Sequence, residues 1–330
     1  MRGEPLESST VLDRKDEILG PLDPTRYTTL MRLVTDPQMR LVVAFGGGSV
    51  PGLCGNTALA RILEELGIKP HVEQVWGTSA GAAVGGPWAS GSNAQRIFDC
   101  IAGLDRRGSV DISWFKLAFS LMLKPFGTRL PDGLIKGRHF SAAIEAAFSK
   151  HTFEECEIPF RCIACTDDGN ATRKIFRRGP LLPAIFSSMS IPGIVFPRPR
   201  LAGEKTGFYD GGLVEKTPLI SPIAEHHRDH PKRTLLLLGS HYTNEVKQTA
   251  ARGFLLRFLQ TINALEDLAW HYQIREAREK SGVELLILNP RIDDPSLFDF
   301  SRVERNYLHA REVLADTLQN AKLALSFGLR

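Results

Sequence analysis

The sequence has few cysteines, no long apolar run and no large excess of charge of one sign. Its 5 cysteines are an odd, sparse set among 330 residues, which indicates reduced thiols rather than a disulfide framework. A transmembrane helix needs about 18 or more consecutive apolar residues, and no such run occurs. The first residues lack the apolar stretch of a secretory signal. We therefore expect a cytoplasmic protein, and peripheral binding at the inner face of the membrane stays open.

The weak charge balance also restricts the class of partner. Lys and Arg number 41 and Asp and Glu 37, a net charge of +4 that is too small to indicate a nucleic-acid partner. It is compatible with an anionic membrane surface or an acidic substrate. Apolar residues make up 43% of the chain, enough for the core of a large α/β domain.

The sequence gives little indication of a metal site or a redox site. Cys162 and Cys165 have C-x-x-C spacing, but they fall in a strand-like run where residues three apart face opposite sides of a sheet. We interpret them as core residues. There is also no acidic loop of the kind that binds calcium. No metal and no organic cofactor is expected.

The motif Gly77-Thr78-Ser79-Ala80-Gly81 is the strongest candidate for chemistry. It has the pattern G-x-S-x-G and lies between a predicted strand at residues 72–76 and an Ala-rich helix. This context is typical of a nucleophile elbow, in which a sharp turn lifts the serine hydroxyl above the sheet edge. Glycines at both flanks let neighbouring backbone come close. Ser79 is therefore the candidate nucleophile.

A second glycine-rich segment, Gly46-Gly47-Gly48, follows the predicted strand at residues 41–45. In a parallel β-α-β unit both strands end at the same edge of the sheet, so its N–H groups are expected near Ser79. A nucleophile beside a row of N–H donors is what acyl transfer requires. A phosphate-binding loop is the alternative, but Gly-Lys-Ser/Thr is absent and no acidic residue follows the second strand. The pattern favours a serine hydrolase.

The base that activates Ser79 is less evident. His226, His227 and His230 lie in a solvated charge cluster, whereas His241 follows a predicted strand and stands where a hydrolase histidine would. Asp210 is the other candidate, although Asp-Gly-Gly by itself predicts a hairpin turn. The residues alone leave this choice open.

The three glycine-containing motifs, taken in order, resemble those of the patatin-like phospholipase family. The stretches Ser188-Met189-Ser190-Ile191-Pro192-Gly193 and 210–218 agree with it, and the similarity covers about residues 40–300. The resemblance implies a Ser–Asp dyad, with Ser79 as nucleophile and Asp210 as base. It also implies an oxyanion hole formed by Gly46, Gly47, Gly48 and Ser49. The glycines that would support the motifs are Gly52, Gly77, Gly81, Gly211 and Gly212.

One position departs from the family pattern. Family members commonly carry Arg or Lys just before the last glycine of the glycine-rich motif, and here that residue is Pro51. A cation beside the oxyanion or a phosphate headgroup is therefore missing from this place. The departure bears on the substrate class more than on the reaction.

Strand and helix patterns alternate along the chain and predict a mostly parallel central sheet flanked by helices, an α/β fold. We expect an N-terminal arm of unknown role at residues 1–39 and a catalytic domain at 40–325. Residues 112–123, rich in large apolar side chains, predict either a core helix or a lid within residues 105–135. A longer helix at residues 244–280 has an apolar face with steps of three and four, formed by Phe254, Phe258, Ile262, Leu265, Ala269 and Tyr272.

These observations predict a serine acyl hydrolase for fatty-acyl esters of phospholipids or lysophospholipids, acting at a lipid or membrane surface. A Ser-His-Asp triad esterase for small esters, with His241 as base, is one alternative. A non-catalytic lipid-binding regulator of the same fold is the other, although an intact Ser79 and Asp210 argue against it.

Overall fold

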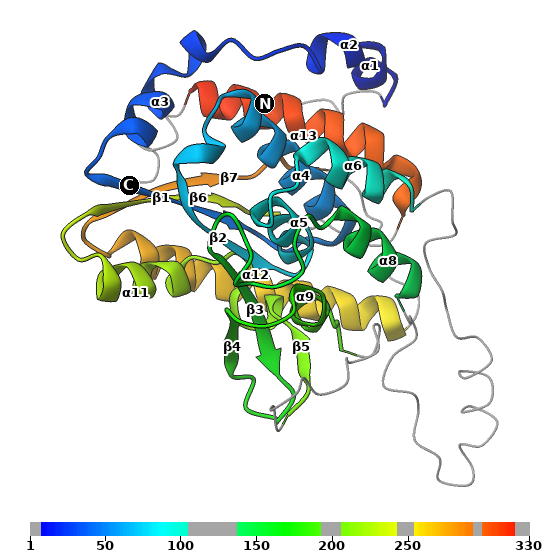
Figure 1. The fold of residues 1–330 in the computed structure, drawn as a ribbon. Helices are drawn as coiled ribbons and strands as arrows, with labels where there is room; N and C mark the ends of the chain where they lie inside the picture. The colour runs from blue at the N-terminus through cyan, green and yellow to red at the C-terminus, as the bar shows by residue number, and fades with distance from the viewer. Residues whose placement is uncertain (1–7, 105–136, 193–205, 243–253, 293–298, 321–330) are drawn as a thin grey trace, which may run out of the picture.

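A twisted sheet runs through the centre of the computed structural model (Figure 1), which describes residues 8–104, 137–192, 206–242, 254–292 and 299–320. In these residues seven strands form one sheet in the order β4-β3-β2-β1-β6-β7, with β5 paired to β3. Their bounds are β1 Met39–Phe45, β2 Val72–Thr78, β3 Phe160–Thr166, β4 Arg173–Phe176, β5 Phe208–Asp210, β6 Thr234–Ser240 and β7 Val283–Leu288.

Five of these strands, β3, β2, β1, β6 and β7, run parallel, whereas β4 and β5 pair antiparallel with β3. The central strands are apolar on both faces, as expected where helices cover both sides of a parallel sheet. Val43 and Phe45 of β1 belong to one apolar core, and Val42 and Ala44 belong to the other. The predicted α/β class with a mostly parallel sheet is confirmed.

Helices cover the two faces unequally. One face carries α3 Thr28–Thr35, α4 Ser49–Glu65, α5 Ala80–Ala89, α6 Ala94–Ala102, α8 Arg138–Ala147 and α13 Val303–Gln319. The other carries α11 Ile220–Asp229 and α12 Phe254–Arg278. Helix α9 Leu181–Ser188 contacts β3 and β5, and α10 Gly212–Glu215 contacts β3 and α12. Two short N-terminal helices, α1 Ser8–Asp13 and α2 Lys15–Ile18, pack against α13.

Helix α4 begins at Ser49 and tolerates Pro51 in its first turn, where a backbone N–H has no intrahelical partner to lose. One local prediction was wrong. The Asp210-Gly211-Gly212 segment is not a hairpin turn. It leads from β5 directly into α10, because β5 pairs with β3 and not with a strand that follows it.

Two further expectations concern the membrane. The predicted lid region, residues 105–135, lies outside the described residues. Among the described helices, none combines the length and the apolar character needed to cross a bilayer.

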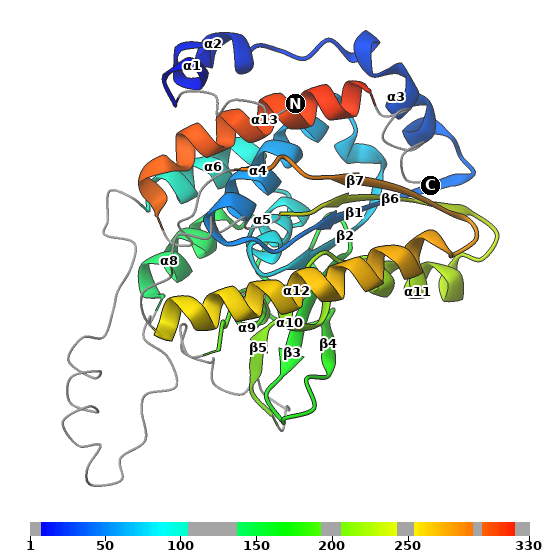
Figure 2. The same cartoon turned by 180° about the vertical axis from the view of Figure 1, so that it is seen from behind.

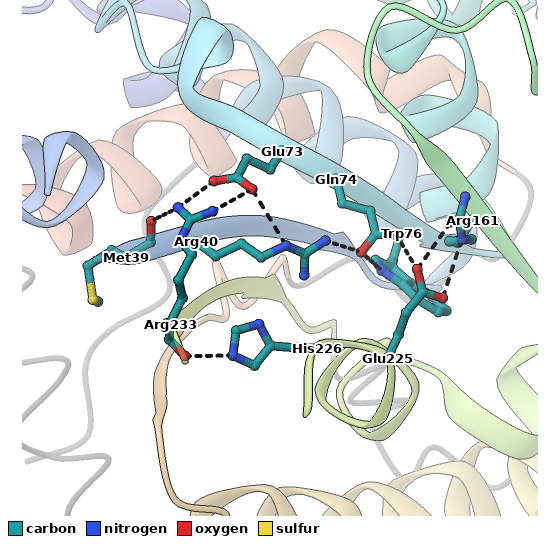
Figure 3. A network of polar contacts seen from close by, with 9 residues as sticks. All are labelled: Met39, Arg40, Glu73, Gln74, Trp76, Arg161, Glu225, His226 and Arg233. Carbon is teal, nitrogen blue, oxygen red and sulfur yellow. Dashed lines mark hydrogen bonds and ion pairs between the residues drawn. The ribbon is translucent and has the colours of Figure 1, made fainter. Parts of the chain in front are cut away.

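A buried polar network occupies the first half of the parallel strands (Figure 3). The Nη2 of Arg40, on β1, donates to the Oε1 of Gln74, on β2, at 3.0 Å, and the Nε2 of Gln74 donates to the Oε1 of Glu225, on α11, at 2.6 Å. Glu225 also pairs with Arg161 of β3 at 3.1 Å. Arginine thus neutralises the buried Glu225 carboxylate. This network joins three strands to α11 at the end of the sheet opposite the glycine motifs.

Candidate active site

Ser79 lies in the turn between β2 and α5, as the G-x-S-x-G pattern predicts. Its backbone has φ +52° and ψ −121°, a conformation that L-residues rarely adopt and that marks a strained elbow. Gly81 makes the turn possible, because a Cβ at this position would collide with the carbonyl group of Phe45. The strained turn directs the Ser79 hydroxyl away from the sheet and into a pocket.

Asp210 is the hydrogen-bond partner of that hydroxyl. The Ser79 Oγ donates to Asp210 Oδ2 at 2.6 Å, and the N–H of Gly212 donates to Asp210 Oδ1 at 2.7 Å. The carboxyl is 5% exposed. Burial and, to a lesser extent, the nearby Glu266 carboxylate together raise the pKa of Asp210 to about 7, against the opposing effects of Ser79, Gly212 and Lys216. A carboxylate with this pKa is a far better proton acceptor near neutral pH than an ordinary aspartate.

Ser188, at the end of α9, connects the two halves of this arrangement. Its Oγ accepts the Ser79 N–H at 2.8 Å and donates to the carbonyl of Ile163 in β3 at 2.5 Å. Its own carbonyl accepts the N–H of Gly211 at 3.2 Å. Ser188 therefore holds both the elbow and the segment that carries Asp210. Sequence reasoning placed Ser188 in a family-like stretch but assigned it no role, because nothing local indicates a contact with Ser79, 109 residues away.

In the glycine-rich segment, the later residues Gly48 and Ser49 place their N–H groups beside the pocket. The N–H of Gly46 donates to Ser240 Oγ at 3.1 Å, and that of Gly47 donates to the carbonyl of Lys216 at 2.8 Å. In the part of the chain that the structure describes, the N–H groups of Gly48 and Ser49 have no protein partner. Both residues line the pocket with Ser79 and stand at the N-terminus of α4. A helix N-terminus presents free N–H groups and a partial positive charge, which suits an anion.

The pocket between these groups has a volume of about 40 Å³. Its wall is partly apolar and partly charged, and consists of Gly47, Gly48, Ser49, Ser79, Ile191, Pro192, Asp210, Gly212, Leu213, Lys216, Ile262, Asn263 and Glu266. Lys216 is 3% exposed at its side chain and pairs with Glu266 at 3.4 Å and with Asp267 at 3.5 Å. The pocket thus contains a cation, although the sequence has Pro51 where family members have a basic residue. Lys216 was not predicted, since its position depends on the packing of α10 against α12.

His241 lies outside this arrangement. Its Nδ1 is hydrogen-bonded to Thr217 Oγ1 at 3.0 Å, and its ring stacks on Trp270 with centroids 3.8 Å apart. It is 2% exposed, and burial lowers its pKa to about 3, so the ring is neutral. The structure gives it no contact with Ser79. On α11, His226 and His227 are hydrogen-bonded to main-chain carbonyls.

The remaining predicted positions pack against neighbouring elements and do not line the pocket. Gly52 packs against Ala80, and Gly77 packs against Ala82, so both close the space between α4, β2 and α5. Cys162 and Cys165 are buried, free thiols. Within the described ranges, no group of three or more His, Cys, Asp and Glu side chains is arranged to hold a metal ion.

Comparisons with known proteins place the chain in a family. A sequence model of the patatin-like phospholipases matches residues 43–223, more than half of the chain, which include Ser79 and Asp210. The chain belongs to the patatin-like phospholipase family. The predicted class, a hydrolase of carboxylic esters, agrees with this membership.

Similar proteins include a putative patatin-like phospholipase domain-containing protein, M110.7, of Caenorhabditis elegans. It is 27% identical over 58% of this chain and 16% of its own length. The lysophospholipase NTE1 of Debaryomyces hansenii is 25% identical over 88% of this chain and 18% of its own length. The chain therefore spans less than a fifth of these relatives. The crystal structure of VipD from Legionella pneumophila matches with a TM-score of 0.42 and 12% identity, over 86% of this chain and 67% of that one.

Proposed function

We propose that the protein is a serine acyl hydrolase that cleaves fatty-acyl esters of phospholipids or lysophospholipids. One observation carries the proposal: a strained elbow serine donates a 2.6 Å hydrogen bond to a buried carboxyl whose pKa is about 7. Family membership and the apolar side chains of Ile191, Leu213 and Ile262 in the pocket wall support a fatty-acyl substrate. The relative named a lysophospholipase is consistent with it.

The geometry supports a two-step reaction. Asp210 accepts the hydroxyl proton as the Ser79 Oγ attacks the ester carbonyl carbon, and the carbonyl oxygen gains negative charge. The free N–H groups of Gly48 and Ser49 are the proposed donors to this oxyanion, since those of Gly46 and Gly47 are engaged within the protein. Collapse of the intermediate breaks the ester C–O bond, and Asp210 returns the proton to the departing alcohol. Water then attacks the acyl carbon while Asp210 accepts its proton. The bond between that carbon and the Ser79 Oγ breaks, the fatty acid leaves, and Asp210 returns the proton to the Ser79 Oγ.

The test is labelling of the protein with a fluorophosphonate probe, together with turnover of a soluble short-chain ester. We expect stoichiometric labelling that is lost in Ser79→Ala. His241→Gln should keep turnover within a factor of a few, because the ring makes no contact with Ser79. If His241→Gln abolishes turnover at unchanged thermal stability, the triad alternative replaces this proposal. If wild-type protein neither labels nor turns over ester, the non-catalytic alternative does.

We place this hydrolase at a lipid surface, on the cytoplasmic side of a membrane. The five cysteines are free and so suit a reducing compartment.

A further inference from the structure

Helix α12 exposes an apolar strip to solvent. Its members are Leu265, Leu268 and Tyr272, which are 60%, 54% and 64% exposed. Leu268 follows Leu265 by three positions and Tyr272 follows Leu268 by four, so the side chains lie one above the other on the same face of the helix. Leu12 on α1 and Leu19, directly after α2, are less exposed, at 45% and 40%.

A second face of α12 belongs to the catalytic pocket. Ile262 and Glu266 line the pocket together with Asn263, and Trp270 and Ile274 pack against the core on that side of the sheet. Leu265 directly precedes Glu266 in the chain, so the strip begins beside the pocket. Figure 2 shows α12 along the outside of the molecule, with no other helix or strand in front of it. The apolar periodicity of this segment predicted a single face, but the structure divides its residues between pocket, core and solvent.

The surroundings of the strip favour a lipid surface as its partner. Arg257 and Arg275 are exposed and stand 18 residues apart, which is five helical turns, so they share one line along the helix beside the strip. Basic residues beside an exposed apolar stripe, with a tyrosine among the apolar groups, are the pattern of a helix that lies in a membrane interface. Glu276 and Glu279 are also exposed at the C-terminal end of the strip, and Glu276 pairs with Lys280 at 3.3 Å. The charges beside the strip are therefore mixed, and apolar contact is the larger contribution to binding.

We propose that the strip formed by Leu265, Leu268 and Tyr272 docks the protein on a lipid surface and sets the mouth of the catalytic pocket against it. The inference rests on the proposed function, because a hydrolase of membrane lipids must take its substrate from a bilayer. Docking through α12 brings the strip and the pocket residues Ile262 and Glu266 to the same surface. The lipid then has only a short path between bilayer and Ser79.

The experiment separates docking from catalysis. Full-length protein with Ser79→Ala is sedimented with vesicles of phosphatidylcholine and phosphatidylglycerol, so that no lipid is consumed. The triple variant Leu265→Ser, Leu268→Ser and Tyr272→Ser is made in this background and also in the active protein. The matched control is Leu12→Ser with Leu19→Ser, which removes exposed leucines from α1 and from the end of α2, two helices that lie far from α12 in both views.

We expect the triple variant to lose at least tenfold in vesicle affinity, while the control variant binds as before. In the active protein the triple variant should hydrolyse a soluble ester at the wild-type rate and melt at the wild-type temperature, since its side chains are exposed. Unchanged vesicle binding by the triple variant overturns the proposal. So does a change from dimer to monomer in size-exclusion chromatography without loss of vesicle binding, which makes the strip an interface between copies. Strip-dependent vesicle binding by a protein that turns over no soluble ester supports docking and refutes the proposed function alone.

Discussion

The two ends of the parallel strands each carry a buried polar cluster, but the two clusters balance charge differently. At the first end, Glu225 receives hydrogen bonds from Arg161 and Gln74, and Arg40 adds a further positive charge nearby. At the other end, the donors to Asp210 among the described residues are uncharged, Ser79 and Gly212.

Lys216 is the cation of the second cluster, and its ion pairs are with Glu266 and Asp267 rather than with Asp210. The difference separates a structural network from a reactive one. A carboxylate neutralised by arginine is a poor base, whereas one that is buried without a direct cation partner keeps a high proton affinity.

The largest expected effect comes from Asp210→Asn. Asparagine preserves the shape of the side chain and still accepts the Gly212 N–H, but it does not take a proton from Ser79. We expect ester hydrolysis to fall by about three orders of magnitude or more, with little further loss in the double variant with Ser79→Ala, because the two residues act as one unit. Turnover of Asp210→Asn within tenfold of wild type would show that Asp210 is not the base.

Although Asp210→Asn should lose activity, it should gain stability at alkaline pH. Because the folded-state pKa of Asp210, about 7, lies above its ordinary value, the folded protein binds this proton more tightly than the unfolded chain. The resulting stabilisation is fully present below the ordinary pKa of 3.8 and is lost progressively as the pH rises from there to about 7. At pH 8 asparagine removes the cost of the buried charge, so Asp210→Asn should be more stable than wild type by roughly 1–3 kcal/mol. Denaturant unfolding at pH 5 and pH 8 measures this, and equal effects at both pH values would contradict it.

A substitution in the first cluster should have the reverse effects, a large loss of stability and little loss of activity. Glu225→Gln leaves Arg161 without its carboxylate partner and weakens the acceptor of the Gln74 amide, and we expect a loss of about 2–4 kcal/mol in unfolding free energy. Hydrolysis by the remaining folded protein should stay within a factor of a few, because the network lies at the far end of the strands. A loss of activity comparable to that of Asp210→Asn, at full stability, would show that the two clusters are coupled.

How much of this could be read from the sequence depends on the range of each contact. Ser79 and its flanking glycines form a local motif whose turn, strand and helix are contiguous, so the elbow was predictable. Asp210 is 131 residues from Ser79, and only the resemblance to a family placed it. Lys216 and Glu266 reach the pocket through the packing of α10 against α12, which leaves no trace in spacing or composition.

Helix α12 shows a second limit. Apolar residues at steps of three and four predicted the helix and an amphipathic face. Periodicity does not say which part of a broad face packs on the protein, and Leu265 and Tyr272 are exposed. The start of α4 is also not evident from composition. Pro51 and Gly52 are typical of loops, yet both are accommodated in the first turn of α4.

Ser188→Ala is expected to have an intermediate effect. It removes the acceptor of the Ser79 N–H and the bond to Ile163, so the elbow loses an anchor while the dyad itself remains. We expect kcat to fall about 10- to 100-fold with KM nearly unchanged, because small displacements of a nucleophile are costly. Ser188→Thr, which keeps a hydroxyl, should recover part of the rate. Ser187→Ala is the matched control, since this buried neighbour donates to the Pro183 carbonyl instead. Equal losses in both variants would mean that Ser188 only supports folding.

The smallest expected effect is a shift in pH dependence from Glu266→Gln. Hydrolysis requires deprotonated Asp210, so kcat/KM should rise with pH through an apparent pKa near 7. The Glu266 carboxylate raises that pKa, and it also pairs with Lys216, whose charge lowers it. Its neutralisation removes the first effect and leaves Lys216 with one fewer partner. Both changes act in the same direction, and the midpoint should move down by roughly half a pH unit or more. Asp267→Asn is the control, because this carboxylate pairs with the same lysine but is about one-third exposed and absent from the pocket wall. Its shift should be smaller. A midpoint that stays in place or moves up in Glu266→Gln would show that the charge of Glu266 does not act on Asp210.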